Sequence, residues 1–287
     1  NNDRRSETDD SGSVGEKRCG MIRDITIGQY YPADSILHRL DPRVKFVSTL
    51  VYIVSLFLFS SWLGYGVAAI FLIALIGLSK VPFKFMVKGL KPLVILMVIT
   101  MFFNMIFTPG EAIFSFWIIT ITKEGVQMAV KISIRLVFLI IGASLMTLTT
   151  TPNQLTDGLE RLLRPLNKLH VPVHDIAMMM SIALRFIPIL LDETDKIMKA
   201  QTARGADFES GGLIQKVKSM VPLLVPLFVS AFRRANDLAM AMEARCYHGG
   251  DGRTQMKPLT YKKRDYLAYL IVFAYLGVSI VFRAAGI

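Results

Sequence analysis

Long apolar runs separated by short polar or basic stretches are the main pattern of this sequence. Five of these runs reach or approach the roughly 20 apolar residues that a transmembrane helix needs. They are Val44–Ser60, Trp62–Leu78, Pro92–Phe107, Val126–Thr149 and Tyr266–Phe282. A further apolar stretch, Ile113–Thr120, is too short to span, and we expect it to lie at the membrane interface. The pattern predicts an all-α polytopic membrane protein with about five transmembrane helices.

Basic residues indicate which ends of these spans face the cytoplasm. The loop after the second run carries Lys80, Lys84, Lys88 and Lys91, and residues 150–264 contain seventeen Lys or Arg residues. Because cytoplasmic loops carry such an excess, both clusters predict a cytoplasmic N-terminus. Lys131 and Arg135 interrupt the fourth run, and we expect them to snorkel, to face other helices or to line a partner contact.

Amphipathic helical segments follow the fourth run. Thr151-Pro152-Asn153 starts the first, Gln154–Leu169, whose leucines lie on one side, as in a helix on a membrane surface. The second, which we call the first arm, extends from Asp175 to Gly205 and contains Pro188. Its apolar or neutral stripe is Ile187, Leu190, Leu191, Thr194, Ile197, Met198 and Gln201. A shift of 41 positions gives a similar stripe in a second arm: Phe228, Ala231, Phe232, Ala235, Leu238, Ala239 and Met242.

Each arm ends on an alanine and an arginine followed by a small residue. These tips are Ala203-Arg204-Gly205 and Ala244-Arg245-Cys246, and the two arginines are 41 positions apart. A plain structural explanation exists, because glycine suits a left-handed helix cap and arginine in a last turn favours the helix dipole. Repetition at the same angular position also favours a shared binding role, since the planar guanidinium can bind a carboxylate through two hydrogen bonds.

Composition agrees with a membrane protein and argues against several other classes. The chain has 287 residues, 53% of them hydrophobic, 19% charged, with a net charge of +11. Its mean hydropathy is +0.46. The basic residues lie between apolar segments rather than in one stripe, so we expect no nucleic-acid binding. Residues 1–20 are polar and lack the apolar core of a signal peptide, and we interpret them as a disordered leader or an added expression sequence.

The sequence contains few candidates for metal-binding, nucleotide-binding or catalytic residues. Cys19 and Cys246 are far apart in sequence and do not form the closely spaced Cys/His set of a zinc site. His170 and His174 are four positions apart, but Pro172 lies between them and no acidic residue directly follows the first, so we expect no metal site. The sequence has no phosphate-binding Gly-x-x-x-x-Gly-Lys-Ser/Thr loop, and the spans lack paired carboxylates. We expect no catalytic residues, and we interpret Asp192, Glu193 and Asp195 as a solvated or partner-facing acidic patch.

Three motifs in a fixed order resemble a known family. They are Leu40-Asp41-Pro42-Arg43-Val44-Lys45, where Asp41 can cap a helix that starts at Pro42, then Leu184-Arg185-Phe186-Ile187-Pro188, and finally the two tips. Together they are similar to the transmembrane T subunit of energy-coupling factor transporters, the EcfT/CbiQ family. The resemblance covers essentially all of residues 21–287.

The resemblance implies a fold, partners and a role. It implies membrane domains at residues 21–149 and 265–287, and three long cytoplasmic coupling helices within residues 150–264. The tips would lie in grooves of two ABC ATPase subunits of the EcfA type, which bind ATP and Mg, so this chain would be a non-catalytic subunit with no cofactor of its own. A membrane-embedded S subunit would capture a vitamin or transition metal. The residues suggested for its contact are Met178, Met179, Met180, Leu224 and Phe228.

Two other classes of protein remain as alternatives at this point. A self-contained secondary transporter would carry its own midplane site, for which the spans offer little beyond Lys131 and Arg135. An intramembrane enzyme would need a catalytic cluster within the spans. The resemblance favours a bacterial cell membrane as the location. It also implies that the substrate is chosen by another polypeptide.

Overall fold

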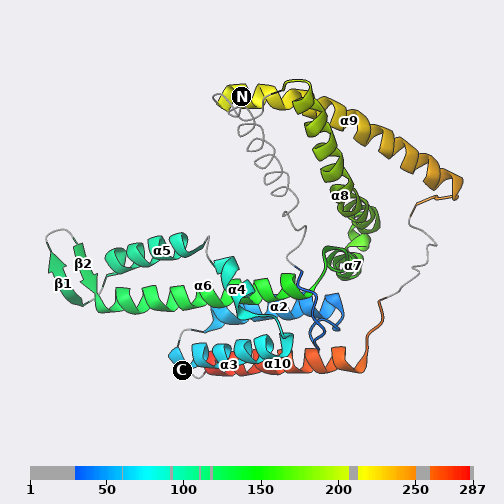
Figure 1. The fold of residues 1–287 in the computed structure, drawn as a ribbon. Coiled ribbons are helices and arrows are strands. Elements are labelled where there is room, and N and C mark those ends of the chain that lie inside the picture. The colour runs from blue at the N-terminus through cyan, green and yellow to red at the C-terminus, as the bar shows by residue number, and fades with distance from the viewer. Residues whose placement is uncertain are drawn as a thin grey trace, which may run out of the picture. The chain divides into compact units, whose positions relative to one another are not determined.

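The computed structural model describes residues 30–59, 61–90, 93–109, 111–116, 119–206, 213–249 and 259–284. Two compact units divide the chain: Gly28–Leu162 with Lys257–Ile287 form one, and Leu163–Met256 belong to the other. We refer to them as the membrane unit and the arm unit and describe each by itself (Figure 1). The expected leader at residues 1–20 and the glycines at 211, 212, 250 and 252 lie outside the described residues.

The membrane unit is a helical bundle with one small β-hairpin. Its helices are α2 (Pro42–Leu58), α3 (Trp62–Ser79), α4 (Phe83–Leu90), α5 (Val94–Phe107), α6 (Lys123–Thr149), α7 (Pro152–Leu163) and α10 (Lys263–Ala284). Strands β1 (Ala112–Phe116) and β2 (Ile119–Thr122) pair in antiparallel fashion between α5 and α6. The short apolar stretch that we expected at the interface is this hairpin. The mainly helical, polytopic fold class is confirmed.

Side-chain caps explain where several of these helices begin. Asp41 accepts a hydrogen bond from the Arg43 amide, and Pro42 occupies the first turn of α2, as predicted. Ser61 caps α3 and Thr122 caps α6 in the same way. At α7, the Thr151 hydroxyl accepts from the Gln154 amide, while the Gln154 side-chain oxygen accepts from the Thr151 amide. Each distance is 3.3 Å. This reciprocal arrangement satisfies two backbone N–H groups that a helix start leaves unpaired.

The core of the membrane unit lies where α2, α3, α6 and α10 meet. Helix α6 contacts α2, α3, α4 and α5, and α10 packs against α2 (Figure 1). Tyr275 of α10 stacks on Phe71 of α3 with ring centroids 4.2 Å apart, and its hydroxyl is hydrogen-bonded to Ser55 of α2 at 3.1 Å. Gly142 lets α6 approach α2 closely, because a Cβ there would lie 2.5 Å from a ring carbon of Tyr52.

Arg135 joins the fourth predicted span to the break between the first two. Its Nη2 donates to the Phe59 carbonyl at 3.1 Å and to the Tyr65 hydroxyl at 2.8 Å. Phe59 is the C-cap of α2, where backbone carbonyls lack helical partners. Lys131 lies over the Trp62 ring, 5.8 Å from its centroid. Of the three possibilities that we considered, these two cations therefore face other helices.

Length and composition allow four helices of the described chain to cross a membrane: α3, α6, α10 and α8 (Val173–Ala203) of the arm unit. The first three match predicted spans. Helix α5 is apolar but has only 14 residues, and α2 has 17. The fourth candidate, α8, was expected to be the first arm. Its first half is apolar, and its second half carries the charges of an exposed helix.

The arm unit consists of a short 3-10 helix and two long α-helices. The 3-10 helix, Arg164–Leu169, continues α7, so the helix predicted at Gln154–Leu169 has two parts. Helix α8 and helix α9 (Leu213–Ala244) are the two arms predicted from the sequence. Both helices contain prolines: Pro188 lies inside α8, and Pro222 and Pro226 lie inside α9. The domain boundaries expected at residues 150 and 264 stay predictions.

Candidate functional site

The first arginine tip ends α8 with a defined capping motif. Arg204 is the residue after the last helical position, and Gly205 has a positive φ of 89°. The Gly205 amide donates to the Thr202 carbonyl at 2.9 Å, and the Ala206 amide donates to the Gln201 carbonyl at 3.0 Å. These two bonds define a Schellman motif, which satisfies carbonyls that the helix end leaves unpaired.

The second tip repeats this geometry although it lacks glycine. Cys246 takes the place of Gly205 and has a positive φ of 55°. Its amide donates to the Glu243 carbonyl at 2.9 Å, and the Tyr247 amide donates to the Met242 carbonyl at 3.1 Å. Each donor and each acceptor is 41 positions from its counterpart in the first tip. The two helix ends therefore hold their arginines on the same backbone frame.

The residues of both tips are available to a partner. Ala203, Arg204 and Gly205 are exposed, as are Ala244, Arg245 and Cys246, and the cysteine is a free thiol. The alanines present little side chain beside each guanidinium, so another backbone could come close. Within the described chain, no group of three or more His, Cys, Asp or Glu side chains could hold a metal ion. The tips offer positive charge and hydrogen-bond donors.

Behind the tips, α8 and α9 contact each other through one ion pair and an apolar groove. Arg234 Nη2 donates to Glu193 Oε2 at 3.1 Å. The groove beside this pair has a volume of about 300 Å³. Its lining residues are Ile182, Phe186, Leu190, Ala231, Arg234, Ala235, Leu238, Ala239 and Met242. The expected acidic patch is wrong for Glu193, because this carboxylate faces the other arm.

A second candidate surface is the apolar half of each arm. Met179, Met180, Leu224 and Phe228 are exposed, and Phe228 has 61% of its surface accessible. Met178 is half-buried. Further exposed apolar residues continue the surface on α9: Met220, Val221, Val225, Val229 and Phe232. Exposed apolar surface on this scale is characteristic of a membrane or protein contact.

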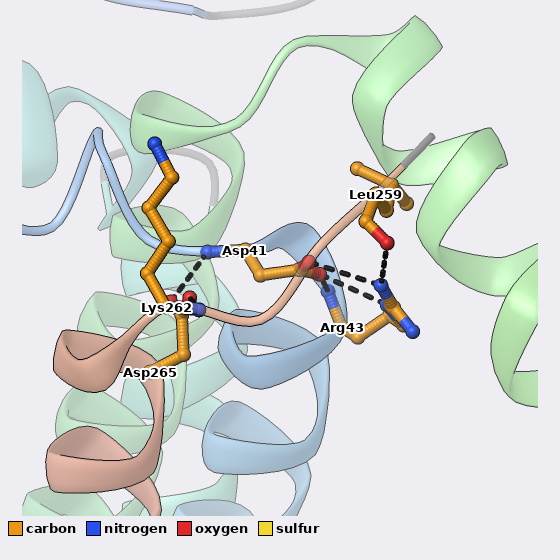
Figure 2. A network of polar contacts seen from close by, with 5 residues as sticks. All are labelled: Asp41, Arg43, Leu259, Lys262 and Asp265. Atoms are coloured by element: carbon orange, nitrogen blue, oxygen red, sulfur yellow. Dashed lines mark hydrogen bonds and ion pairs between the residues drawn. The ribbon is translucent and has the colours of Figure 1, made fainter. Parts of the chain in front are cut away.

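The Asp-Pro-Arg motif at the start of α2 is part of a polar network with the start of α10 (Figure 2). Asp265 is 1% exposed, and its carboxylate accepts from the Lys262 amide at 2.7 Å and from the Asp41 amide at 3.0 Å. One buried side chain thus accepts hydrogen bonds from the amides of the residues that immediately precede two helices. Negative charge at two helix N-termini is also favoured by the helix dipoles.

Arg43 closes this network from the other side. Its guanidinium makes two hydrogen bonds to the Asp41 carboxylate, at 3.1 and 3.2 Å, and donates to the Leu259 carbonyl at 2.9 Å (Figure 2). It also lies over the Tyr261 ring, 4.2 Å from the centroid. The motif therefore ties the segment before α10 to the start of α2. The other motif residues, Arg185 and Pro188, are exposed on α8.

Known proteins are similar to this chain over most of its length. The sequence model of the family CbiQ, described as cobalt transport protein, matches residues 33–256. The chain belongs to the CbiQ/EcfT family. A protein of Clostridium kluyveri named energy-coupling factor transporter transmembrane protein EcfT is 57% identical over 265 residues, which is 92% of this chain and 98% of the relative.

Other EcfT relatives support this assignment. The proteins with the same name from Acidaminococcus fermentans and Bacillus subtilis are 52% and 48% identical to this chain. The matches cover 93% and 88% of this chain, and 99% and 97% of the relatives. As an EcfT-type protein, the chain is the transmembrane component of an energy-coupling factor transporter, and the expected family is confirmed.

Sequence patterns revealed the two tips of the chain. They did not reveal the contact between the arms or the contact between the starts of α2 and α10. Asp265 stands among the basic residues before the last span, so nothing in the local pattern marked it as the partner of Asp41. Glu193 and Arg234 are themselves 41 positions apart, so the repeat that identified the tips also contained the signal for their pairing.

Proposed function

We propose that this chain is the energy-coupling scaffold of its transporter. Arg204 and Arg245 would bind two cytoplasmic ABC ATPase subunits, and the arms would pass ATP-driven movement to a substrate-binding S subunit. The cargo class that the family suggests is a vitamin or a transition-metal ion. The observation that carries the proposal is the duplicated capping geometry, which presents both arginines on matching exposed frames.

The chemistry of the tips suits an acidic groove on a partner. A guanidinium can make paired hydrogen bonds to a carboxylate, and such charge-assisted bonds are stronger than neutral ones. The Schellman motif fixes where each arginine leaves the helix, so binding does not have to order the backbone first. Two matching tips fit two related ATPase subunits, one on each.

In this proposal, other chains bind the ATP and the substrate. ATP and Mg would be bound by the ATPase subunits, and this chain would serve as a non-catalytic lever between them and the S subunit. Rotation of an arm by an ATPase would displace its apolar half, where Met179, Met180, Leu224 and Phe228 are exposed. Flexible methionines suit a surface that exchanges or slides against a partner.

The location that we propose is the bacterial cell membrane, with the N-terminus and both tips in the cytoplasm. Two observations agree with this orientation. Basic residues gather in residues 150–264 and around Lys80, as cytoplasmic segments require. The joined starts of α2 and α10 place these helices in parallel, as the predicted order of crossings demands.

Charge reversal of the tips tests the proposal. We expect Arg204→Glu and Arg245→Glu each to weaken co-purification of the ATPase subunits, and the double variant to lose about 100-fold or more in affinity, because a buried charge pair lost on one side typically costs 2–5 kcal/mol. ATP-driven uptake, followed with labelled vitamins and transition-metal ions, should fall in parallel. Membrane insertion should be unchanged, since both side chains are exposed.

Lys199→Glu and Arg233→Glu provide matched controls for this experiment. Both residues are exposed cations on the same two arms but lie away from the tips. They change the net charge by the same amount as the tip variants, so a general charge effect would appear in them as well. Full ATPase binding and uptake in the double tip variant would refute the coupling role.

A further inference from the structure

The contact between the two arms has a regular geometry. From α8, the groove is lined by Ile182, Phe186 and Leu190, and from α9 by Ala231, Ala235 and Ala239. Each set is spaced by four residues and forms one ridge along its helix. When ridges of this kind interdigitate, helices cross at an angle of about 50° rather than lying side by side. The alanines on α9 let the two backbones come close at such a crossing.

Apolar packing does not fill this contact. An open groove of about 300 Å³ lies beside the two ridges, so the side chains that line it have partner atoms on one side only. Alanine methyl groups also provide few contacts with the larger side chains of α8. Ridge packing therefore favours a crossing near 50° but leaves a scatter of about 15–20°, within which a polar contact can select one angle.

The ion pair between Glu193 and Arg234 provides this polar contact. The two side chains are 27% and 39% exposed, so water reaches them only in part. Arg234 also lines the groove, which places the charged contact directly beside the alanine ridge. A directional hydrogen bond of 3.1 Å restrains rotation in a way that smooth apolar surfaces cannot.

This ion pair joins equivalent positions of the two arms. Glu193 and Arg234 are 41 positions apart, as are the two tip arginines. Arg204 lies eleven residues after Glu193, and Arg245 lies eleven residues after Arg234. At a rise of about 1.5 Å per residue, each tip is roughly 16 Å of helix beyond the contact. The arms thus have equal lengths measured from this point.

We propose that the Glu193–Arg234 pair is the pivot contact that fixes the angle between the arms and hence the spacing of the two tips. The two residues are positioning residues, because they act on the ATPase-binding arginines only through the arms. The arms contact each other along the alanine ridge of α9, and the groove beside it leaves space into which the arms can rotate. The role in transport rests on the proposed coupling function, but the effect on tip spacing does not.

A distance measurement between the arms tests the pivot in the full-length protein alone. Spin labels on Lys199→Cys and Met240→Cys, both at exposed positions five residues before the tips, report the spacing of the arms in lipid nanodiscs by pulsed electron resonance. The native cysteines are replaced in this background. We expect one main distance. Glu193→Arg or Arg234→Glu should reduce its share of the population by about two- to fivefold, the range typical for loss of a partly exposed ion pair.

The charge swap distinguishes a pivot from general packing. Glu193→Arg combined with Arg234→Glu should restore the main distance, because the opposite charges are again paired. The matched controls are Asp192→Arg and Arg233→Glu, which make the same charge changes one position away at exposed sites and should leave the distance unchanged. The neutral variants Glu193→Gln and Arg234→Gln supply the measurement if charge reversal prevents insertion.

Two results would overturn the pivot. One is a distance distribution in the single and neutral variants that matches the unmodified arms. The other is a charge swap as broad as the single variants, which would assign the effect to packing. Because ATPase subunits are absent from this experiment, either result leaves the coupling proposal standing.

Adding the partners then connects the pivot to transport. With co-expressed ATPase subunits, a non-hydrolysable ATP analogue should shift the main distance in the unmodified protein and in the charge swap. The single variants should still bind the ATPases, since their tips are intact, but should hydrolyse ATP without a defined shift. A different pair of results would support the coupling function and reject the pivot. The tip variants would lose ATPase binding, while the single Glu193 and Arg234 variants would still show the same distance shift as the unmodified protein.

Discussion

Cys246 shows how a single residue can hold a demanding backbone conformation. Left-handed backbone at an ordinary L-residue costs about 1–2 kcal/mol, a cost that glycine avoids. The second tip nevertheless has the same two capping bonds as the first. The sequence placed a small residue there, but it could not show that the left-handed turn was kept. The strain is offset by the bonds to the carbonyls of Met242 and Glu243.

Substitutions at this capping position should destabilise the end of α8 and stabilise the end of α9. Gly205→Ala should loosen the end of α8 by about 1 kcal/mol, because a Cβ there meets no atom within 4 Å and only backbone strain is added. Cys246→Gly should tighten the end of α9 by a similar amount. Amide hydrogen exchange at residues 201–206 and 242–247 measures both effects.

Each tip is the internal control for the other in this measurement. Gly205→Ala should leave exchange at residues 242–247 unchanged, and Cys246→Gly should leave residues 201–206 unchanged. Faster exchange at the second tip after Cys246→Gly would contradict the strain argument.

His38 gives the segment before α2 a dependence on pH. Its Nε2 donates to the Tyr31 carbonyl at 3.0 Å, and its Nδ1 accepts from the Ser35 hydroxyl at 2.7 Å. Burial lowers the pKa of His38 below its usual value of 6.5; the bond to Tyr31 opposes this shift, and the charge of Lys45 adds to it. Its neutral form therefore favours the folded segment above about pH 6.5, and this contribution is lost as the pH falls through the lowered pKa.

Replacement of His38 by glutamine should remove this pH dependence. The glutamine amide can still donate to the Tyr31 carbonyl but does not titrate between pH 5 and pH 8. Thermal unfolding in detergent from pH 8 to pH 5 should show a steeper loss of stability for the unmodified protein than for His38→Gln. Parallel curves for the two proteins would show that another group controls acid sensitivity.

At the scale of elements, the start of α10 is joined to the start of α2 by one buried carboxylate. Asp265 accepts from the amide of Lys262, just before its own helix, and from the amide of Asp41, just before α2, so each helix start depends on the other. An acid at this position of a helix would ordinarily be interpreted as a capping residue of that helix alone. The contact spans 224 positions of sequence, a separation at which local periodicity carries no information.

Asp265→Asn should separate these two helix starts. The amide group retains one oxygen, so one of the two backbone N–H groups, on Asp41 or on Lys262, loses its acceptor in a buried place. Such a loss costs about 1–3 kcal/mol, and the unfolding temperature in detergent should fall accordingly. Asp237→Asn, an exposed acid on α9, is the matched control. An equal unfolding temperature for the two variants would contradict this role of Asp265.

Prediction from sequence succeeded for elements with a strong local signal. Periodicity and residues that are neighbours in sequence were enough for three of the five predicted spans, which match α3, α6 and α10, for the two arms and for the cap at Asp41. The β-hairpin was not predicted because its stretch was judged only by its length as a possible span, although Ile119–Thr122 alternates apolar and polar residues as a strand does. The candidate tips were predicted from their repetition, whereas the pairing of Glu193 with Arg234 depends on how two helices meet.

At the scale of the whole molecule, the proposed function makes this chain dependent on its partners. Purified alone in liposomes, it should neither hydrolyse ATP nor accumulate substrate. With both ATPase subunits and an S subunit added, ATP hydrolysis and uptake should appear together. A self-contained secondary transporter would instead move substrate without them, driven by an ion gradient, so this reconstitution separates the two classes directly.

Walker-type lysine variants of the ATPase subunits provide the control for reconstitution. They should assemble with this chain through its intact tips but should support no uptake. Uptake by the chain alone, or with these inactive ATPases, would exclude the coupling role.

The hydrogen bond from Arg43 to Leu259 also limits how far the second tip can move, because it fixes one end of the segment that follows this tip. Leu259 follows Cys246 by thirteen positions in the sequence, and a fully extended chain covers at most about 3.5 Å per position. The tip therefore cannot travel farther than about 45 Å from this anchor, however strongly an ATPase pulls. Lengthening the tether should leave binding at the tip intact while relaxing this upper limit on its stroke.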